Sequence, residues 1–456
     1  MTLSKYIKKI TNLFNNKRTK AKTESLTKKI IENKTIKVYS LSEDRNEYER
    51  NKTLIDNSLK EVLNDVKVSK ALEENSIEKF SGVKRLYLPS DHCDIRKKYS
   101  WKMENLGKVL DLEKNIINGF FTLNTIAIDE NKRDVTLLEI KVFSNKEEKF
   151  IKQDELKKLK NGNIKEKDRK EEIELLIEKD EHINKTVSIM RQTESVSKIL
   201  KKTSPEILLC HIHDSFADMN EYFKHIDQNL KDEFVVRGRA TRVSTQTKLN
   251  QKGNEVKVKL IYSEFSNKES KVIDKLKLKG KVYQHAKSII EWDKIEIEGS
   301  WYTTVRITLK TREGKNIFKN PMLLISNIEV SSYLQAKEIY HIYLLRNKIE
   351  AVFKFLKDVL GWEEFQVRDW ESIKNLIALC FFIGNYFYEI ESALIEHPTI
   401  EIICELGNGK GIISRFFFLK GLEKLLIAES IFNFKKDKGI SDDKWNEITG
   451  FAGITH

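Results

Sequence analysis

Residues 339–360 carry an aromatic side chain, two cations and a carboxylate at helical spacing. At about 100° per residue, Tyr343, Arg346, Glu350 and Lys357 fall within about 60° of one another. A neighbouring sector is apolar and would face a core: Ile342, Leu345, Ile349, Val352, Phe353, Leu356 and Leu360. A carboxylate can bind a metal ion, and guanidinium and ammonium groups can bind phosphate. The stretch therefore predicts one wall of a phosphate- and metal-binding site, if Glu350 has partners elsewhere.

Two further carboxylates follow strand-like segments. Asp91 comes directly after RLYLPS, and Asp214 comes directly after EILLCHIH. Three hard oxygen ligands, Asp91, Asp214 and Glu350, would suit Mg²⁺ or Mn²⁺. Two such ions can activate water or a 3′-hydroxyl and stabilise the leaving oxygen in an in-line displacement at phosphorus. A single acid at a strand end is more often a solvated cap or turn former, so the hypothesis depends on all three.

The elements that would position these acids follow a mixed order. Strand-like segments lie at 85–91, 116–129, 134–144, 206–212 and 233–239. With the intervening helical patterns the order is β-β-β-α-β-α-β, then a β-rich insertion, then the helix with Glu350. No G-x-G-x-x-G follows any strand, which weighs against a doubly wound dinucleotide-binding sheet. We predict an α/β fold with a ribonuclease-H-like mixed sheet and helical N- and C-terminal regions.

Five regions are expected along the chain. In order, they are a basic helical DNA-binding region (1–78), the first part of a catalytic core (79–239, with a charged helical insertion at 145–185), a β-rich insertion (240–330), the second part of the core (331–395) and a C-terminal helical region (396–456). Residues 1–40 contain eleven Lys or Arg and two acids. This segment would either contact DNA phosphates or form a solvated, partly disordered tail. The β-rich stretch could also be a small separate domain.

Composition sets broader limits. The 456 residues carry a formal charge of +13, which favours a polyanionic partner, although genomic base bias can give the same Lys-rich composition. The four cysteines form no C-x-x-C pair, so we expect reduced thiols without a disulfide framework or zinc knuckle. The N-terminus lacks a signal peptide's apolar core, and the longest uncharged run, 375–388, is too short for a bilayer. A soluble cytoplasmic protein without membrane contact is expected.

Two other patterns are weaker. His211, His213 and Asp214 could form a metal cluster on a strand, but alternation points both histidines to one face and Asp214 to the other. Core histidines are therefore favoured. The run from Gly407 to Gly411 hints at a phosphate loop, yet it lacks the first P-loop glycine and a Ser or Thr after its Lys. A turn between helices is the better interpretation.

Three blocks of this chain resemble a known family. The spacing Tyr343-x2-Arg346-x3-Glu350-x6-Lys357 resembles the Y-R-E-K signature of the insertion-sequence-four family of DDE transposases. DSFAD from Asp214, followed by FVVRGR, is similar to that family's D-R-E-A-D and the strand after it, with Ser and Phe replacing Arg and Glu. DHCDIRK, which begins at Asp91, resembles the block around the first aspartate. The resemblance covers roughly residues 80–395.

The resemblance implies roles for seven residues, listed here by type. The metal-binding catalytic triad would be Asp91, Asp214 and Glu350, and the DNA-binding residues would be Tyr343, Arg346, Lys357 and Arg237. For Arg346 the alternative is an ion pair along the helix, for Tyr343 plain packing, and for Arg237 a solvated strand end. The implied cofactor is Mg²⁺ or Mn²⁺, with two ions.

The implied function is cut-and-paste DNA transposition. The enzyme would cleave double-stranded DNA at a mobile element's terminal inverted repeats and join the freed 3′-hydroxyl to target DNA, acting as a homodimer on DNA in the bacterial nucleoid. The alternatives are a nuclease of the same fold that does not transfer strands, and a degenerate or domesticated DNA-binding protein. Three acids in place argue against degeneracy.

Overall fold

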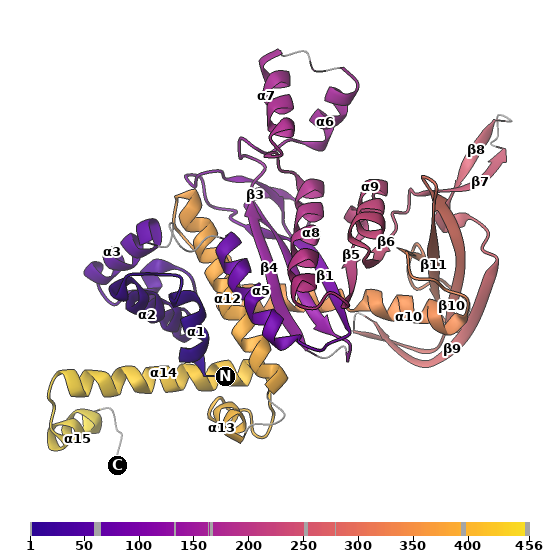
Figure 1. The fold of residues 1–456 in the computed structure, drawn as a ribbon. Coiled ribbons are helices and arrows are strands. Elements are labelled where there is room, and N and C mark those ends of the chain that lie inside the picture. The colour runs from indigo at the N-terminus through magenta and orange to yellow at the C-terminus, as the bar shows by residue number, and fades with distance from the viewer. Residues whose placement is uncertain are drawn as a thin grey trace. The chain divides into compact units, whose positions relative to one another are not determined.

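The computed structural model describes residues 2–58, 65–131, 134–162, 164, 167–249, 254–278, 280–393 and 398–451 (Figure 1). The chain divides into two compact units. The larger unit comprises residues 65–354, and the smaller unit combines residues 1–64 with residues 355–456. The fold is mixed α/β, as the sequence predicts.

A ten-stranded mixed sheet runs through the larger unit, in the order β2-β3-β1-β5-β6-β12-β11-β10-β9, with β4 also paired to β3. The strands are β1 (Arg85–Arg96), β2 (Gly107–Leu110), β3 (Ile116–Asp129), β4 (Val135–Phe143), β5 (Leu208–His213), β6 (Glu233–Arg237), β9 (Asn267–Leu278), β10 (Lys281–Ile297), β11 (Ser300–Lys310) and β12 (Met322–Ser326). Strand β1 is antiparallel to β3 and parallel to β5, which is parallel to β6. A two-stranded sheet of β7 (Val243–Leu249) and β8 (Glu255–Lys259) stands apart.

The first strand is longer than expected. The prediction that it ends at Asp91 is wrong, because β1 continues to Arg96. Pairing with β5 stops at Pro89, but pairing with β3 continues to the end of β1. Asp91 therefore lies two residues beyond the parallel ladder and is still held by the antiparallel one.

The β-rich segment is continuous with the rest of the sheet. Strand β12 pairs with β6, and the Ser326 hydroxyl donates to the Phe234 carbonyl oxygen at 2.6 Å. Strands β9 to β12 therefore extend the sheet, so the alternative of a small separate domain is wrong for these strands.

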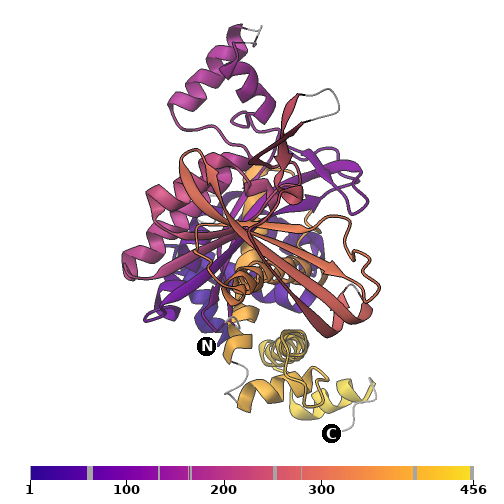
Figure 2. The same ribbon diagram turned by 90° about the vertical axis from the view of Figure 1, so that its right-hand side faces the viewer.

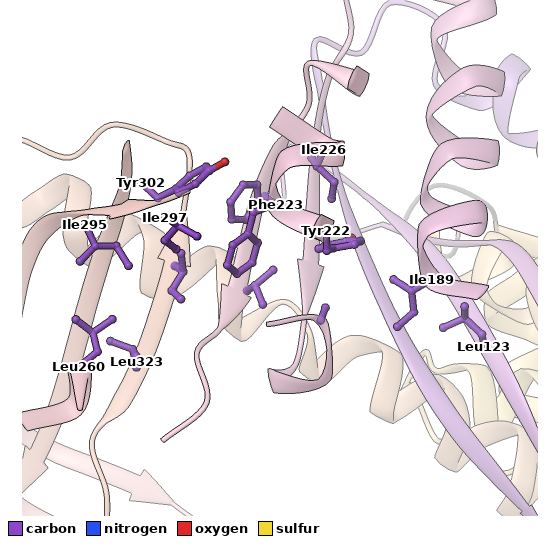
Figure 3. Close-up of a cluster of buried hydrophobic side chains, with 14 of the residues drawn as sticks. Leu123, Ile189, Tyr222, Phe223, Ile226, Leu260, Ile295, Ile297, Tyr302 and Leu323 are labelled. Carbon is purple, nitrogen blue, oxygen red and sulfur yellow. The ribbon is translucent and has the colours of Figure 1, made fainter. Parts of the chain in front are cut away.

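Helix α8 (Lys185–Thr203) packs on one face of the sheet in the larger unit (Figure 1). An apolar cluster fills the space beneath it and extends along the sheet, as Figure 3 shows for Leu123, Ile189 and Tyr302. The rings of Phe223 and Phe234 stack with centroids 5.0 Å apart, a contact worth about 0.5–1.5 kcal/mol beyond burial. The predicted charged insertion forms α6 (Gln153–Lys160) and α7 (Lys167–Glu178), which project away from the sheet in Figures 1 and 2.

Helix α5 (Asp65–Lys79) belongs to the larger unit. The Ser69 hydroxyl donates to the carbonyl oxygen of Ile140 on β4 and accepts from its N–H. The expected N-terminal region reaches residue 78, whereas the structural division falls before residue 65, because α5 packs against the sheet.

The smaller unit is helical. Its helices are α1 (Leu3–Thr11), α2 (Lys17–Asn33), α3 (Arg45–Thr53), α12 (Trp370–Ala393), α13 (Pro398–Leu406), α14 (Arg415–Asp437) and α15 (Asp442–Phe451). Tyr6 is 1% exposed, and its hydroxyl donates to the Phe382 carbonyl oxygen at 2.8 Å. The disordered-tail alternative is therefore wrong for the described part of the basic segment, because most of its apolar side chains are buried. Gly407 to Gly411 lie in the turn between α13 and α14, which confirms the turn interpretation.

Across the residues described, no helix combines the length and the apolar character that crossing a membrane requires.

Candidate active site

The guanidinium of Arg346 lies among three carboxylates of the larger unit. Its Nη2 is 2.9 Å from Asp91 Oδ2 and 3.7 Å from Asp214 Oδ2. Its Nη1 is 2.5 Å from Glu350 Oε1. The structure thus brings together the three acids that the sequence singles out, around one cation that it also singles out. The ion pair between Arg346 and Glu350 shows that the alternative noted for Arg346 is also realised.

The backbone around Arg346 differs from the expected single helix. Helix α10 (Tyr333–Leu344) ends before this residue, and α11 (Asn347–Leu360) begins after it. The Arg346 N–H bonds to the Tyr343 carbonyl oxygen at 3.0 Å, and the Ile349 N–H bonds to the Arg346 carbonyl oxygen at 3.1 Å. These bonds span three residues instead of four, a tighter geometry in which residues three apart share a face. The uninterrupted helix over 339–360 is therefore wrong, but Tyr343 and Arg346 still both reach Asp214.

Asp91 is the most buried of the three acids, with the residue 9% exposed. One carboxylate oxygen accepts the His92 N–H at 2.9 Å, and the other accepts from Arg346. Burial raises the pKa of Asp91 to about 7, with Asp214 and Glu350 adding to the rise and Arg346 opposing it. A proton therefore competes with cations for this carboxylate near neutral pH.

Asp214 follows the last residue of β5 and has three neighbours. Its Oδ1 accepts from the Tyr343 hydroxyl at 3.4 Å and lies 3.7 Å from Arg237 Nη1. Burial, and then the charge of Asp214, raise the pKa of Tyr343 to about 12, so this hydroxyl remains a donor at neutral pH. Arg237 ends β6, and its side chain is 47% exposed. Asp214 therefore has the Tyr343 hydroxyl and the Arg237 guanidinium beside it, in addition to Arg346.

Glu350 and Lys357 lie on the same helix but have different surroundings. Glu350 is in the first turn of α11, where the helix dipole favours negative charge, and its side chain is 55% exposed. Lys357 belongs to the smaller unit, where its amino group lies 2.9 Å from Glu363. The helical spacing of these two residues therefore does not by itself place them in one site.

Asn124 was not predicted from the sequence. It lies directly opposite Asp91 in the β1–β3 ladder, so the two side chains share a face of the sheet. Its amide nitrogen donates to the Thr122 hydroxyl at 2.9 Å, and its buried carbonyl oxygen has no hydrogen-bond partner within the described residues. No sequence motif marks Asn124, because its position depends on strand register.

The two histidines of β5 face away from the three acids. His211 bonds to Asp232, which accepts from Ser197 on α8 at 2.6 Å. His213 bonds to the Tyr222 hydroxyl, which is 3.2 Å from Thr193 on α8. The interpretation as core histidines is confirmed. Burial lowers the pKa of His213 well below its ordinary value, so it is neutral.

The acids form no ready-made metal cluster. Among the described residues, no three His, Cys, Asp or Glu side chains are close enough to hold an ion together. Asp91, Asp214 and Glu350 are hard oxygen donors, however, and they already converge on one positive group. The raised pKa of Asp91 indicates that this one guanidinium does not compensate for its burial and acidic neighbours. The donor set therefore fits a divalent cation that would add positive charge.

Comparison with known proteins gives one family match. Residues 132–386 match the family model described as "Transposase DDE domain". This span contains Asp214, Arg237, Arg346 and Glu350 and begins after Asp91. No curated protein sequence matches the chain.

Proposed function

Because the chain belongs to the transposase DDE domain family, we propose that it is a cut-and-paste DNA transposase. It would hydrolyse phosphodiester bonds at the ends of a mobile element, and the freed 3′-hydroxyl would then attack target DNA. The convergence of Asp91, Asp214 and Glu350 on Arg346 is the observation that carries this proposal.

The strand order supports a ribonuclease-H-like core with the features of the insertion-sequence-four family. Strands β4, β3 and β1 are antiparallel neighbours, and β5 and β6 continue in parallel from β1. Asp91 lies on the central strand of this group, and Asp214 follows the strand beside it. Glu350 comes from the helix after the β-rich segment. These locations support the proposal that Asp91, Asp214 and Glu350 are the catalytic carboxylates.

Each group near the acids has a proposed task. Asp91, Asp214 and Glu350 would hold Mg²⁺ or Mn²⁺, and two such ions would supply activation of the attacking oxygen and stabilisation of the leaving oxygen. Arg346 and Arg237 would bind backbone phosphate oxygens, for which a guanidinium fork is suited. The protonated Tyr343 hydroxyl would donate to the same backbone. Lys357, which belongs to the smaller unit, would also contact DNA.

The proposed partner is double-stranded DNA, at both the terminal inverted repeats and the target. The charge of +13 favours such a polyanion. Two copies of the chain would pair two element ends. Exposed apolar residues on α14, such as Ile431 and Phe432, offer a contact surface for the second copy.

A nicking and joining assay on the element's own terminal repeats tests the proposal. Wild type should cut and join these ends with Mg²⁺ or Mn²⁺, and Asp91→Ala, Asp214→Ala and Glu350→Ala should each lose on the order of 100-fold or more. The control is Asp180→Ala, which removes an exposed carboxylate that pairs with Arg191. Cleavage without joined products would instead indicate a nuclease. Specific binding without any cleavage would indicate a DNA-binding protein.

A further inference from the structure

We propose that Arg346 is an exchangeable counter-ion, which holds the three acids before a divalent cation binds and moves to a DNA phosphate when the cation enters. This inference rests on the proposed function and adds a regulation of the same site. In this view, metal loading and DNA capture are coupled through one side chain.

The first support is that Arg346 is shared among all three acids. Nη1 contacts Glu350, whereas Nη2 contacts Asp91 at 2.9 Å and Asp214 at 3.7 Å. An ion pair along the helix would need only Glu350, four residues away. Asp91 is 255 residues away in sequence, so its contact is specific to the fold. The guanidinium therefore occupies the electrostatic centre of the acidic group.

The second support is that the guanidinium is not fully satisfied in this position. Its Nε is buried without a hydrogen-bond partner in the described part of the chain. A buried donor without a partner is costly, and a phosphate offers further acceptor oxygens to the same fork. Arg346 thus has a second class of partner that its present contacts do not exclude.

The third support is charge balance. A divalent cation beside Asp91 would lie close to the guanidinium, whose side chain is only 14% exposed, and these like charges would repel each other. When Arg346 leaves, Asp214 still has the Tyr343 hydroxyl at 3.4 Å and Arg237 at 3.7 Å. A DNA phosphate would offset the charge of the departing guanidinium. Metal and DNA should therefore increase each other's affinity, as linkage requires.

Binding of Mn²⁺ to full-length protein without DNA tests the inference. It can be followed by electron paramagnetic resonance and by calorimetry. Arg346→Gln should bind Mn²⁺ about tenfold more tightly than wild type or better, because a like charge within about 4–6 Å weakens cation binding by this order. Arg346→Lys keeps the charge and should stay within a few-fold of wild type. The control is Arg191→Gln, since Arg191 pairs with Asp180 outside the site.

A second measurement can be made on wild type by itself, which keeps the inference testable if Arg346→Gln fails to fold. A duplex carrying the terminal repeat should tighten Mn²⁺ binding by several-fold, and Arg346→Gln, where folded, should lose most of this coupling. Unchanged or weaker Mn²⁺ binding in Arg346→Gln, no effect of the duplex on wild type, or no Mn²⁺ binding by either protein would overturn the inference.

The two proposals can fail separately. Cleavage by wild type with unchanged Mn²⁺ affinity in Arg346→Gln would reject the counter-ion role alone. Tighter Mn²⁺ binding in Arg346→Gln, without cleavage or joining by wild type, would reject the transposase function and keep the counter-ion role.

Discussion

The hydroxyl of Tyr343 lies 3.4 Å from Asp214 Oδ1, across 129 residues of sequence. This distance is long for a hydrogen bond from a hydroxyl, so the contact should add little to the stability of the fold. Tyr343→Phe should therefore leave folding intact. It should weaken the binding of terminal-repeat DNA by up to about tenfold, which corresponds to the loss of one hydrogen bond. Fluorescence anisotropy measures this change. Tyr340→Phe on the same helix is the control, and an equal loss there would contradict a specific role for Tyr343.

Asp91 should make stability depend on pH in an unusual direction. Burial raises its pKa to about 7, above the value of about 3.9 for an unfolded chain. The folded protein therefore retains a proton that the unfolded chain releases. The resulting stabilisation is complete below about pH 4 and is lost as the pH rises through about 7. In EDTA, Asp91→Asn should gain stability relative to wild type between about pH 5 and pH 8, as measured by urea unfolding.

Asp111→Asn provides a control whose pH dependence lies outside the window of the Asp91 effect. Hydrogen bonds, first from the Asn115 side chain, lower the pKa of Asp111. Its contribution is present above the unfolded pKa and is lost as the pH falls through the folded pKa. Between about pH 5 and pH 8 the stability of Asp111→Asn should follow that of wild type, and a gain like that of Asp91→Asn would show that the effect does not come from Asp91.

Arg237 should act on DNA through charge. Its side chain is about half exposed, and its 3.7 Å separation from Asp214 leaves it available to a phosphate. Arg237→Gln should weaken DNA binding to a similar extent on any sequence, and should reduce the slope of log affinity against log salt by about 1. Binding titrations at several salt concentrations measure both. An unchanged slope, as expected for the Arg191→Gln control, would exclude a phosphate contact at this position.

Tyr6 should stabilise the smaller unit. Its buried hydroxyl donates to the Phe382 carbonyl oxygen at 2.8 Å and accepts from Asn385 Nδ2 at 3.1 Å. Tyr6→Phe leaves these partners without the hydroxyl and should lower the free energy of unfolding by about 1–3 kcal/mol. Chemical denaturation measures the change, with Tyr39→Phe as the control because Tyr39 is 71% exposed. Equal stability of the two variants would contradict a packed N-terminal segment.

Local pattern predicted much of the sheet. Alternation placed strands at 116–129 and 134–144, and the structure has β3 at Ile116–Asp129 and β4 at Val135–Phe143. Asp214 at the end of β5 follows from the same reasoning, because a polar residue after an apolar run ends a buried strand. The charge run at residues 1–40 was more ambiguous. The many lysines obscure the apolar pattern of this segment, in which Tyr6, Ile7 and Ile10 are buried.

The remaining features could not be predicted from the sequence, because they depend on contacts between segments that are far apart in the chain. Asn124 faces Asp91 only through the β1–β3 register, and a shift of one residue would turn it to the other face. The pairing of β12 with β6 likewise has no local signal. The helix break at Arg346 is invisible to periodicity, since the apolar positions on both sides suit a single helix. Tertiary contacts of Arg346 with two strand-borne acids accompany that break.

The pairing of β6 with β12 also affects how the chain is synthesised. Phe234 and its partner Ser326 are 92 residues apart. A ribosome that adds roughly 5–20 residues per second completes β6 roughly 5–18 s before the complementary strand exists. Throughout this interval the outer edge of β6 offers unpaired backbone groups to any other nascent chain. Newly made protein should therefore depend on chaperones until β12 has been translated, and fragments that end before residue 322 should aggregate.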